Sequence, residues 1–223
     1  MALPDRHLDL GCGDKPRNPY GRGELCGIDI RRPPGELGFE LRIANLVTGA
    51  IPFEDGHFGS VSAYDFIEHV PRIFPDATGT GTIFPFIRLM QEIWRVLAPG
   101  GRLYALTPAY PHPEAFVDPT HVNFITDRSH EYFCGEDPKG RMYGFEGRFD
   151  VVRVAWVERA EAYSALADSP ENHPPLKRLS RRLRRWSRWL RGKRAHAAPG
   201  YLLWELEARK PADGERPAGP ALL

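Results

Sequence analysis

Four residues of the sequence have side chains suited to acid–base chemistry. His69 stands in the segment Asp-Phe-Ile-Glu-His-Val (65–70), and His112, Asp118 and His121 lie in a stretch rich in proline and aromatic residues. Histidine titrates near neutrality, so its imidazole can take up the proton of an acceptor hydroxyl. Asp118 and His121 are three residues apart beside a proline, which would let the carboxylate orient the imidazole. We predict that these four residues form the catalytic site.

Two other interpretations of these residues stay open. His69 could only cap or pack a helix, and His112, Asp118 and His121 could form a metal site of two histidines and one carboxylate. We favour acid–base work and predict no metal ligand. The other five histidines are interpreted as surface or structural residues: His7, His57, His130, His173 and His196.

A glycine-containing loop near the N-terminus is typical of a nucleoside site. Residues 6–10 read as a strand that runs into Gly11-Cys12-Gly13, and Asp29 closes the next strand. The glycines allow a tight turn close to a ligand, and a carboxylate at a strand end can accept hydrogen bonds from both ribose hydroxyls. A dinucleotide site needs a small residue at position 16 and a helix N-terminus, but this chain has Pro16. A nucleoside without a phosphate fits better.

The elements that would position these residues follow from the hydrophobic pattern. Strands are predicted over 6–10, 25–29, 40–46, 60–65, 101–106, 149–157 and 201–208. A helix is predicted from Pro85 to Leu97, with apolar residues three and four apart. Between the first two strands, Pro16 and Pro19 leave little room for a helix. This alternation predicts an α/β fold with a mostly parallel sheet.

Six segments, in order, resemble the motifs of class I S-adenosylmethionine-dependent methyltransferases. They are LDLGCGDKP, GIDI, ANLVTGAIPFEDGHFGSV, DFIEHV, EIWRVLAPGGRLYALTP and DPTHVNFIT, over about residues 7 to 126. The chain is most similar to small bacterial members of uncertain substrate, some of them tied to saccharide or surface-glycan synthesis. The resemblance implies a Rossmann-like, mostly parallel seven-stranded sheet with helices on both faces and a closing antiparallel hairpin. It also implies S-adenosyl-L-methionine as the cofactor.

The resemblance assigns roles to residues of this chain. Asp9 and the glycine loop would line the methionine end of the cofactor, Asp29 would hold the ribose, and Asn45 would face the adenine. The end of the fourth strand, residues 64–66, would lie beside the transferred methyl group. Lys15 and Gly59 depart from the pattern of the family, which has glycine and aspartate there. The implied cofactor-binding set is Asp9, Gly11, Cys12, Gly13, Asp29, Ile30, Asn45, Leu46, Tyr64, Asp65 and Phe66.

Charge is distributed unevenly along the 223 residues. Residues 176–194 contain ten Lys and Arg and no Asp or Glu, whereas the rest of the chain has a net charge of −9. Leucines and Trp186 recur there at helical spacing, which predicts an amphipathic basic helix. Such a helix could cover the sheet or contact an anionic membrane surface. Nucleic acid is an unlikely partner because the remaining chain is acidic.

Length and composition predict one domain over residues 1–209, which the resemblance makes a methyltransferase domain. Residues 158–200 would be an insertion carrying the basic helix, and 210–223 a disordered tail. Three widely spaced cysteines argue against both a disulfide framework and a zinc site. Without an apolar span or secretory segment, the sequence favours a cytoplasmic protein, with peripheral contact at the inner membrane surface as a further option.

These observations predict a methyltransferase that uses S-adenosylmethionine to methylate an oxygen of a small or saccharide acceptor, lipid-linked glycans included. Segments 71–85 and 108–145 are the expected substrate walls. One alternative is a catalytically silent subunit of the same fold that binds a partner. Another is a nicotinamide-dependent oxidoreductase, against which Pro16 argues.

Overall fold

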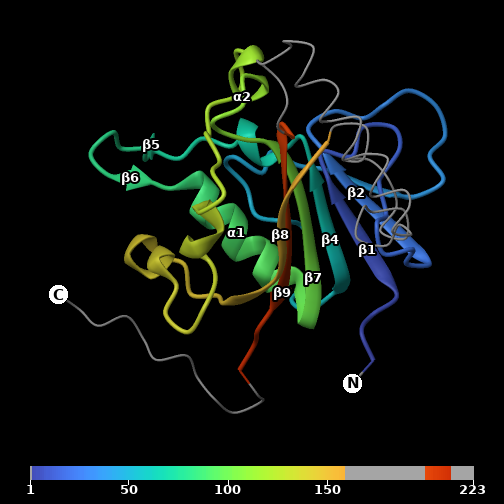
Figure 1. The fold of residues 1–223 in the computed structure, drawn as a ribbon. Helices are drawn as coiled ribbons and strands as arrows, with labels where there is room; N and C mark the ends of the chain where they lie inside the picture. Colours follow the sequence, from blue (N-terminus) through green and yellow to red (C-terminus); the bar gives the residue numbers. More distant parts are fainter. Residues whose placement is uncertain (1, 159–198, 212–223) are drawn as a thin grey trace, which may run out of the picture.

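The computed structural model describes residues 2–158 and 199–211. Seven strands form one sheet in the order β3-β2-β1-β4-β7-β9-β8 (Figure 1). Strands β1, β2, β3, β4 and β7 pair in parallel, and β9 pairs antiparallel with both β7 and β8. The strands are β1 (Arg6–Leu10), β2 (Glu24–Asp29), β3 (Glu40–Ile43), β4 (Phe58–Tyr64), β7 (Leu97–Pro108), β8 (Phe149–Val157) and β9 (Tyr201–Ala208). The predicted parallel sheet and its closing hairpin are confirmed.

Helix α1 (Pro85–Val96) covers one face of the sheet. Pro85 occupies the first turn, and the buried stripe includes Leu89, Met90 and Ile93. This stripe packs with inward residues of the strands, such as Leu8 and Leu103, in the main core. The shorter elements are η1 (Ile67–His69), β5 (Phe74–Pro75), β6 (Thr82–Ile83), α2 (Glu114–Val117), η2 (Ser129–Tyr132) and η3 (Lys139–Tyr143). Helix α1 confirms the helix predicted from Pro85 to Leu97 to within one residue.

The opposite face of the sheet carries a second core, to which the described residues contribute no helix. A second core cluster on that face gathers residues of the strands, among them Tyr64, Tyr104 and Leu203, with Tyr20 packed against it. Among the described residues, no helix contributes to this cluster. The segment between β1 and β2 covers it instead, and Tyr20 donates a hydrogen bond to Glu205 (3.0 Å). The prolines and glycines of that segment explain why it crosses the sheet without helical turns.

Gly59 accommodates the N-terminal segment at the start of β4. A Cβ atom at this position would lie 2.1 Å from the carbonyl oxygen of Pro4 and 3.0 Å from the guanidinium of Arg22. A larger side chain would displace the N-terminal segment. The departure from the family pattern at position 59 therefore has a local packing reason.

The predicted insertion and the predicted tail lie mostly outside the described residues. The basic helix expected over 176–194 falls entirely outside them, and so does the tail from residue 212 onward. Lys210, the first residue of that tail, is held in place, since its ammonium group donates to the carbonyl of Arg95 (2.7 Å) and lies 5.0 Å from the centre of the Trp94 ring. No helix of the described residues has the length and apolar character needed to span a bilayer.

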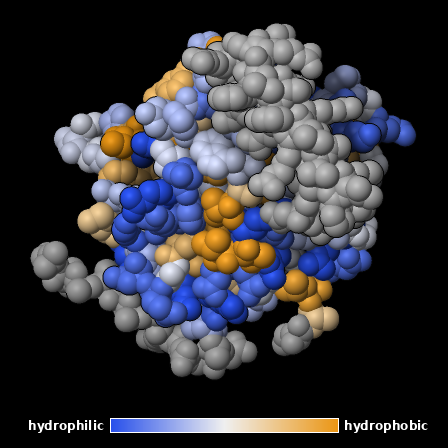
Figure 2. Space-filling model, viewed as in Figure 1, coloured by the Kyte–Doolittle hydropathy of each residue, from blue (hydrophilic) through white to orange (hydrophobic). Residues whose placement is uncertain are grey.

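One visible face of the molecule has an apolar patch surrounded by hydrophilic residues (Figure 2). Strand β8 lies at the edge of the sheet on this side, and its Val151 and Val152 are 48% and 44% exposed. Edge strands with exposed apolar side chains are places where another chain can pair.

A buried polar chain links β1 and β4. His7 contacts the hydroxyls of Ser60 and Ser62 at 2.8 Å through its two ring nitrogens. Ser62 donates to Asp9 (2.6 Å), whose other oxygen accepts the backbone N–H of Arg17 (2.8 Å). Burial lowers the pKa of His7 to about 3 and raises the pKa of Asp9 to about 6. The chain therefore contains a neutral imidazole at physiological pH.

We expect His7 to make the protein sensitive to acid. The unfolded state binds a proton at this residue near pH 6.5 and the folded state only near pH 3, so stability is lost as the pH falls between these values. Relative to His7→Gln, the wild type should lose about 2 kcal/mol of unfolding free energy from pH 6.5 to pH 5. Urea denaturation of both proteins at several pH values measures this difference. A difference that does not change with pH would contradict the assignment.

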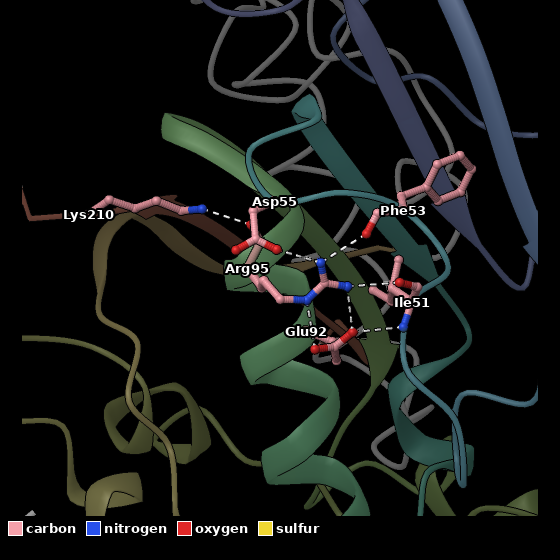
Figure 3. Close-up of polar contacts among 6 residues, drawn as sticks. All are labelled: Ile51, Phe53, Asp55, Glu92, Arg95 and Lys210. Atoms are coloured by element: carbon pink, nitrogen blue, oxygen red, sulfur yellow. Dashed lines mark hydrogen bonds and ion pairs between the residues drawn. The ribbon is translucent and has the colours of Figure 1, made fainter. Parts of the chain in front are cut away.

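Arg95 of α1 anchors the loop that precedes β4 (Figure 3). Its guanidinium donates to the carbonyls of Ile51 (2.8 Å) and Phe53 (2.9 Å) and to the carboxylate of Asp55 (2.7 Å). It also binds Glu92 through two nitrogens, and Glu92 accepts the N–H of Ile51 (2.8 Å). Two carbonyls, one N–H and one carboxylate of this loop are thereby tied to one helix.

Replacing Arg95 by Met should lower the unfolding free energy by about 2 to 4 kcal/mol, because Glu92 and two carbonyls lose charged partners in a partly buried site. The change is measured by urea denaturation. Arg128→Met is the matched control, since Arg128 forms an ion pair with Glu131 on the surface and is 75% exposed. An equal loss of unfolding free energy in the two variants would show that the Arg95 network stabilises the protein no more than a surface ion pair does.

Candidate active site

The glycine loop follows directly from the end of β1. The N–H groups of Gly11 and Cys12 donate to the carbonyl of Ile28 (2.8 and 3.1 Å). Gly11 and Gly13 have φ values of 67° and 58°, in the left-handed region that favours glycine. A Cβ atom on Gly11 would also lie 2.7 Å from the ring of Phe66. The loop therefore needs glycine at position 11 for both conformation and space.

Cys12 fills a space beneath this loop. Its side chain is buried, and a Cβ atom on Gly27 would lie 2.4 Å from its sulfur. Burial raises the pKa of the Cys12 thiol to about 12, so the thiol stays protonated near neutrality. The residue therefore has a packing role beneath the loop.

A cavity of about 530 Å³ opens beside the glycine loop. Its walls are Gly11 to Pro19 together with Tyr64. Arg17 enters this wall, with its guanidinium 5.0 Å from the centre of the Tyr64 ring. The sequence interpretation did not include Arg17, although its position four residues after Gly13 places it in the same loop. Asp9, in contrast, is fully buried and serves the polar chain below the loop.

Asp29 stands beside the glycine loop at the end of β2. One carboxylate oxygen accepts the N–H of Gly13 (3.0 Å), and the other accepts the N–H of Arg31 (3.1 Å). A carboxylate offers about four lone-pair positions, so two stay available for hydroxyl donors. Ile30 follows with 60% of its surface exposed. This pairing of a fixed carboxylate and an exposed apolar side chain suits a nucleoside.

The predicted adenine contact lies after β3. Asn45 is exposed, and its side-chain oxygen accepts the N–H of Val47 (3.0 Å). Leu46 is buried in the main core. Arg88 of α1 holds the same turn by donating to the carbonyl of Val47 (2.7 Å). Helix α1 thus positions this turn through Arg88.

The end of β4 carries the next part of the site. Tyr64 is buried, Asp65 has a φ of 47°, and Phe66 covers Gly11. A positive φ at a residue other than glycine costs free energy and tends to occur at functional sites. The backbone N–H of Asp65 donates to Leu106 (2.9 Å), which fixes this turn. The predicted residues 64–66 therefore lie against the glycine loop.

Two of the predicted histidines meet just beyond this turn. The rings of His69 and His121 have centroids 4.8 Å apart in an edge-to-face arrangement. The Asp118 carboxylate forms no hydrogen bond with the imidazole of His121 among the described residues; the bond between the two residues runs from the backbone N–H of His121 to the Asp118 carbonyl (3.1 Å). Thr120 donates to Asp118 (2.7 Å) and contacts Nδ1 of His69 (2.9 Å). The carboxylate therefore orients His69, through a hydroxyl, and not His121 as the sequence suggested.

Glu68 completes this group, and the sequence interpretation missed it. Its side chain is 1% exposed, and one oxygen accepts the hydroxyl of Thr107 (2.9 Å). The other oxygen, Oε1, has no hydrogen-bond partner. Burial raises the pKa of Glu68 to about 8, and the nearby charges of Asp65 and Asp118 act in the same direction. The adjacent position of Glu68 and His69 in the Asp-Phe-Ile-Glu-His-Val segment was the available signal.

Backbone contacts hold His121 against this group. The N–H groups of Val122 and Asn123 both donate to the carbonyl of Glu68 (2.9 Å each). The side chain of Asn123 donates to Ile67 (3.0 Å) and accepts from Arg72 (2.7 Å). His112 lies apart, where its Nδ1 accepts the N–H of Glu114 (3.2 Å) at the start of α2. Three of the four predicted catalytic residues are therefore brought together, and His112 is not.

A second cavity, also of about 530 Å³, lies on the α1 side of this group. Both predicted wall segments line it, with Arg72 and Phe84 from one and Asn123, Tyr132 and Tyr143 from the other. Phe84 and Tyr143 have ring centroids 5.1 Å apart. The cavity therefore combines aromatic surfaces with a guanidinium.

Comparison with known proteins shows similarity in sequence and in fold. The sequence is 35% identical over 129 residues to the demethylmenaquinone methyltransferase of Thermus thermophilus, and the match covers 51% of this chain. The chain thus spans about half of that relative, since the match also covers 51% of its length. No protein-family model matches the chain.

Two solved structures share the architecture. One comes from the complex between the Haloferax volcanii Trm112 methyltransferase activator and a methyltransferase. Its TM-score is 0.53, with 14% identity over 94% of this chain and 85% of that chain. The other is a SAM-dependent methyltransferase of Archaeoglobus fulgidus, with a TM-score of 0.51 and 15% identity over 91% of this chain and 85% of that one. The chain therefore has the fold of the class I S-adenosylmethionine-dependent methyltransferases.

Proposed function

We propose that this protein is a methyltransferase that uses S-adenosylmethionine to methylate an oxygen of a small or saccharide acceptor. One observation carries the proposal: the glycine loop, held by Asp29, adjoins the strand end that leads into Glu68, His69 and the facing His121. A nucleoside site and a proton-accepting group thus lie at one edge of the sheet. Fold and partial sequence similarity support the same class of reaction.

The residues present fit a nucleoside cofactor without a phosphate. Asp29 keeps lone pairs for two ribose hydroxyls, and Ile30 offers an apolar surface beside them. No helix lies between β1 and β2, a stretch that the structure describes in full, so a diphosphate at the glycine loop would lack the amide groups that usually bind it. Arg17 gives the cavity a cation suited to the carboxylate of the methionine part.

The residues of the chain also suit the transfer itself. When bound, S-adenosylmethionine supplies a methyl group on a sulfonium, which an acceptor oxygen can displace in line. Phe66 and Tyr64 would wall the reacting centre, and alignment there provides much of the acceleration. His121, oriented by the Ala115 carbonyl (3.2 Å from Nδ1), would take up the acceptor proton through its other ring nitrogen.

The second cavity is the proposed acceptor site. Its aromatic walls and Arg72 favour an acceptor with a ring or apolar portion and hydrogen-bonding oxygens. Sugars fit this description, and so do ring-bearing acceptors such as the one in the name of the Thermus relative. Contact of residues 176–194 with an anionic membrane, which would bring lipid-linked acceptors close, stays a prediction because that segment lies outside the described residues.

A catalytically silent subunit that binds a partner is the second candidate. The Haloferax neighbour comes from a complex with an activator, and β8 of this chain offers an exposed sheet edge. This candidate does not require an intact cofactor site. Cofactor binding therefore separates the two.

We expect S-adenosylhomocysteine to bind the wild type in calorimetry, and NAD not to bind. Asp29→Ala should weaken the affinity by about 1.5 to 3 kcal/mol, because charged hydrogen bonds to two hydroxyls are lost. Asp137→Ala is the control, since Asp137 is an exposed carboxylate near η3 paired with Arg141. Binding of NAD alone, or equal affinity of wild type and Asp29→Ala, would refute the proposed cofactor site.

His121→Ala should reduce turnover by about 100- to 10,000-fold with the affinity for S-adenosylhomocysteine unchanged. The assay follows radiolabelled methyl transfer into a panel of sugars and phenols. His57→Ala serves as the control, because its ring stacks on Phe53 away from the histidine pair. Full activity of His121→Ala would assign His121 a structural role only.

A further inference from the structure

We propose that Glu68, His69 and His121 bind a divalent transition-metal ion. One possible ligand atom from each residue lies within 4.8 Å of the other two. Glu68 and His69 are adjacent in the chain, and His121 comes from a later segment that the backbone bonds from residues 122 and 123 to Glu68 hold in place. Two imidazoles and one carboxylate form a ligand set used by zinc and by non-haem iron sites.

The strongest observation is the unpartnered oxygen of Glu68. Oε1 is buried and accepts no hydrogen bond, while Oε2 is satisfied by Thr107. Buried polar atoms are rarely left without a partner, because desolvation is costly. No Lys or Arg forms an ion pair with Glu68 among the described residues, and its closest charged neighbours include Asp65 and Asp118, both acidic. A cation would supply the missing partner of Oε1.

Both imidazoles are prepared as ligands by their other contacts. Nδ1 of His121 faces the carbonyl of Ala115 (3.2 Å), so it carries the proton and leaves the lone pair on Nε2. The hydroxyl of Thr120 gives its proton to Asp118, so it accepts from Nδ1 of His69. Metal-binding histidines usually donate their second N–H to a carbonyl or a carboxylate-linked group in this way. The His69–Thr120–Asp118 chain is therefore an outer layer of the same site.

The geometry requires only a small closure around the ion. Ligands about 2.1 Å from a tetrahedral ion are separated by about 3.4 Å, so atoms that now lie within 4.8 Å of one another must approach by at most about 1.4 Å. His69 and His121 are partly exposed and can move, whereas Glu68 is buried and fixed. Three protein ligands leave a position open for an oxygen of another molecule.

The metal site itself does not depend on the proposed function, but its role does. An acceptor hydroxyl bound at the open position would lose its proton more easily, because a bound cation lowers the pKa of such oxygens. His121 would then act as a ligand instead of taking the proton directly. Both arrangements require His121, so metal binding and not activity decides between them.

The test is titration of the metal-free full chain with Co²⁺, followed by visible absorption and by calorimetry, and repeated with Zn²⁺. We expect one equivalent to bind, and Mg²⁺ not to compete, since it prefers oxygen ligands. Glu68→Gln and His121→Ala should each weaken binding by more than the 10- to 100-fold typical of losing an outer partner, and Thr120→Val by about that amount. Glu68→Gln keeps an oxygen that can accept the hydrogen bond from Thr107. If Glu68→Gln does not fold, His69→Gln is measured in its place.

His112→Ala is the matched control, and we expect it to bind the ion as the wild type does. Loss of binding in His112→Ala, with retention in Glu68→Gln, would overturn the proposal in favour of the His112, Asp118 and His121 set. Binding that survives all of these substitutions would place the ion elsewhere in the chain, and either that result or no binding at all would overturn the proposal. Calorimetry with S-adenosylhomocysteine on the same variants should show unchanged affinity, so failure of the metal site is distinguishable from failure of the cofactor site.

Discussion

Parallel pairing of β1 with both of its neighbours places three strand ends at one edge of the sheet. Leu10 pairs with Ile28 of β2 and with Ala63 of β4, so the glycine loop, Asp29 and Tyr64 follow within a residue of these pairs. Every other feature of the site depends on this register, because a slip of one residue would turn Asp29 or Tyr64 to the other face. The buried polar chain from His7 to Asp9 joins β1 to β4 through Ser60 and Ser62 and helps to fix the register of these two strands.

The second requirement is that the loops at this edge stay fixed without many helices. Gly11 admits the ring of Phe66, and Asp29 ties down Gly13. On the α1 side, Arg88 and Arg95 hold residues 47 to 55 by their carbonyls. One arginine can hold several points of the loop, because its guanidinium has five N–H donors and can bind more than one backbone carbonyl. The site is therefore assembled by hydrogen bonds to backbone more than by packing between helices.

Much of this could be predicted from the sequence, because it depends on local pattern. Strand ends, the glycine loop, Asp29 and the stripe of α1 each have a signature within a few residues. The meeting of His69 and His121 was only partly predictable, since 52 positions of sequence separate them and no periodicity connects them. Glu68 was not predictable for a different reason, because its importance lies in burial and in an unpartnered oxygen. Asp118 was predicted to orient His121, but its carboxylate orients His69, because the hydroxyl of Thr120 links the two side chains.

The account depends on S-adenosylhomocysteine occupying the edge built by β1, β2 and β4. A crystal structure of the complex tests this most directly. We predict both ribose hydroxyls within about 2.5 to 3.0 Å of the Asp29 carboxylate, and the sulfur directed past Phe66 toward His69 and His121. A nucleoside bound elsewhere, or one whose sulfur points away from the histidine pair, would contradict the account.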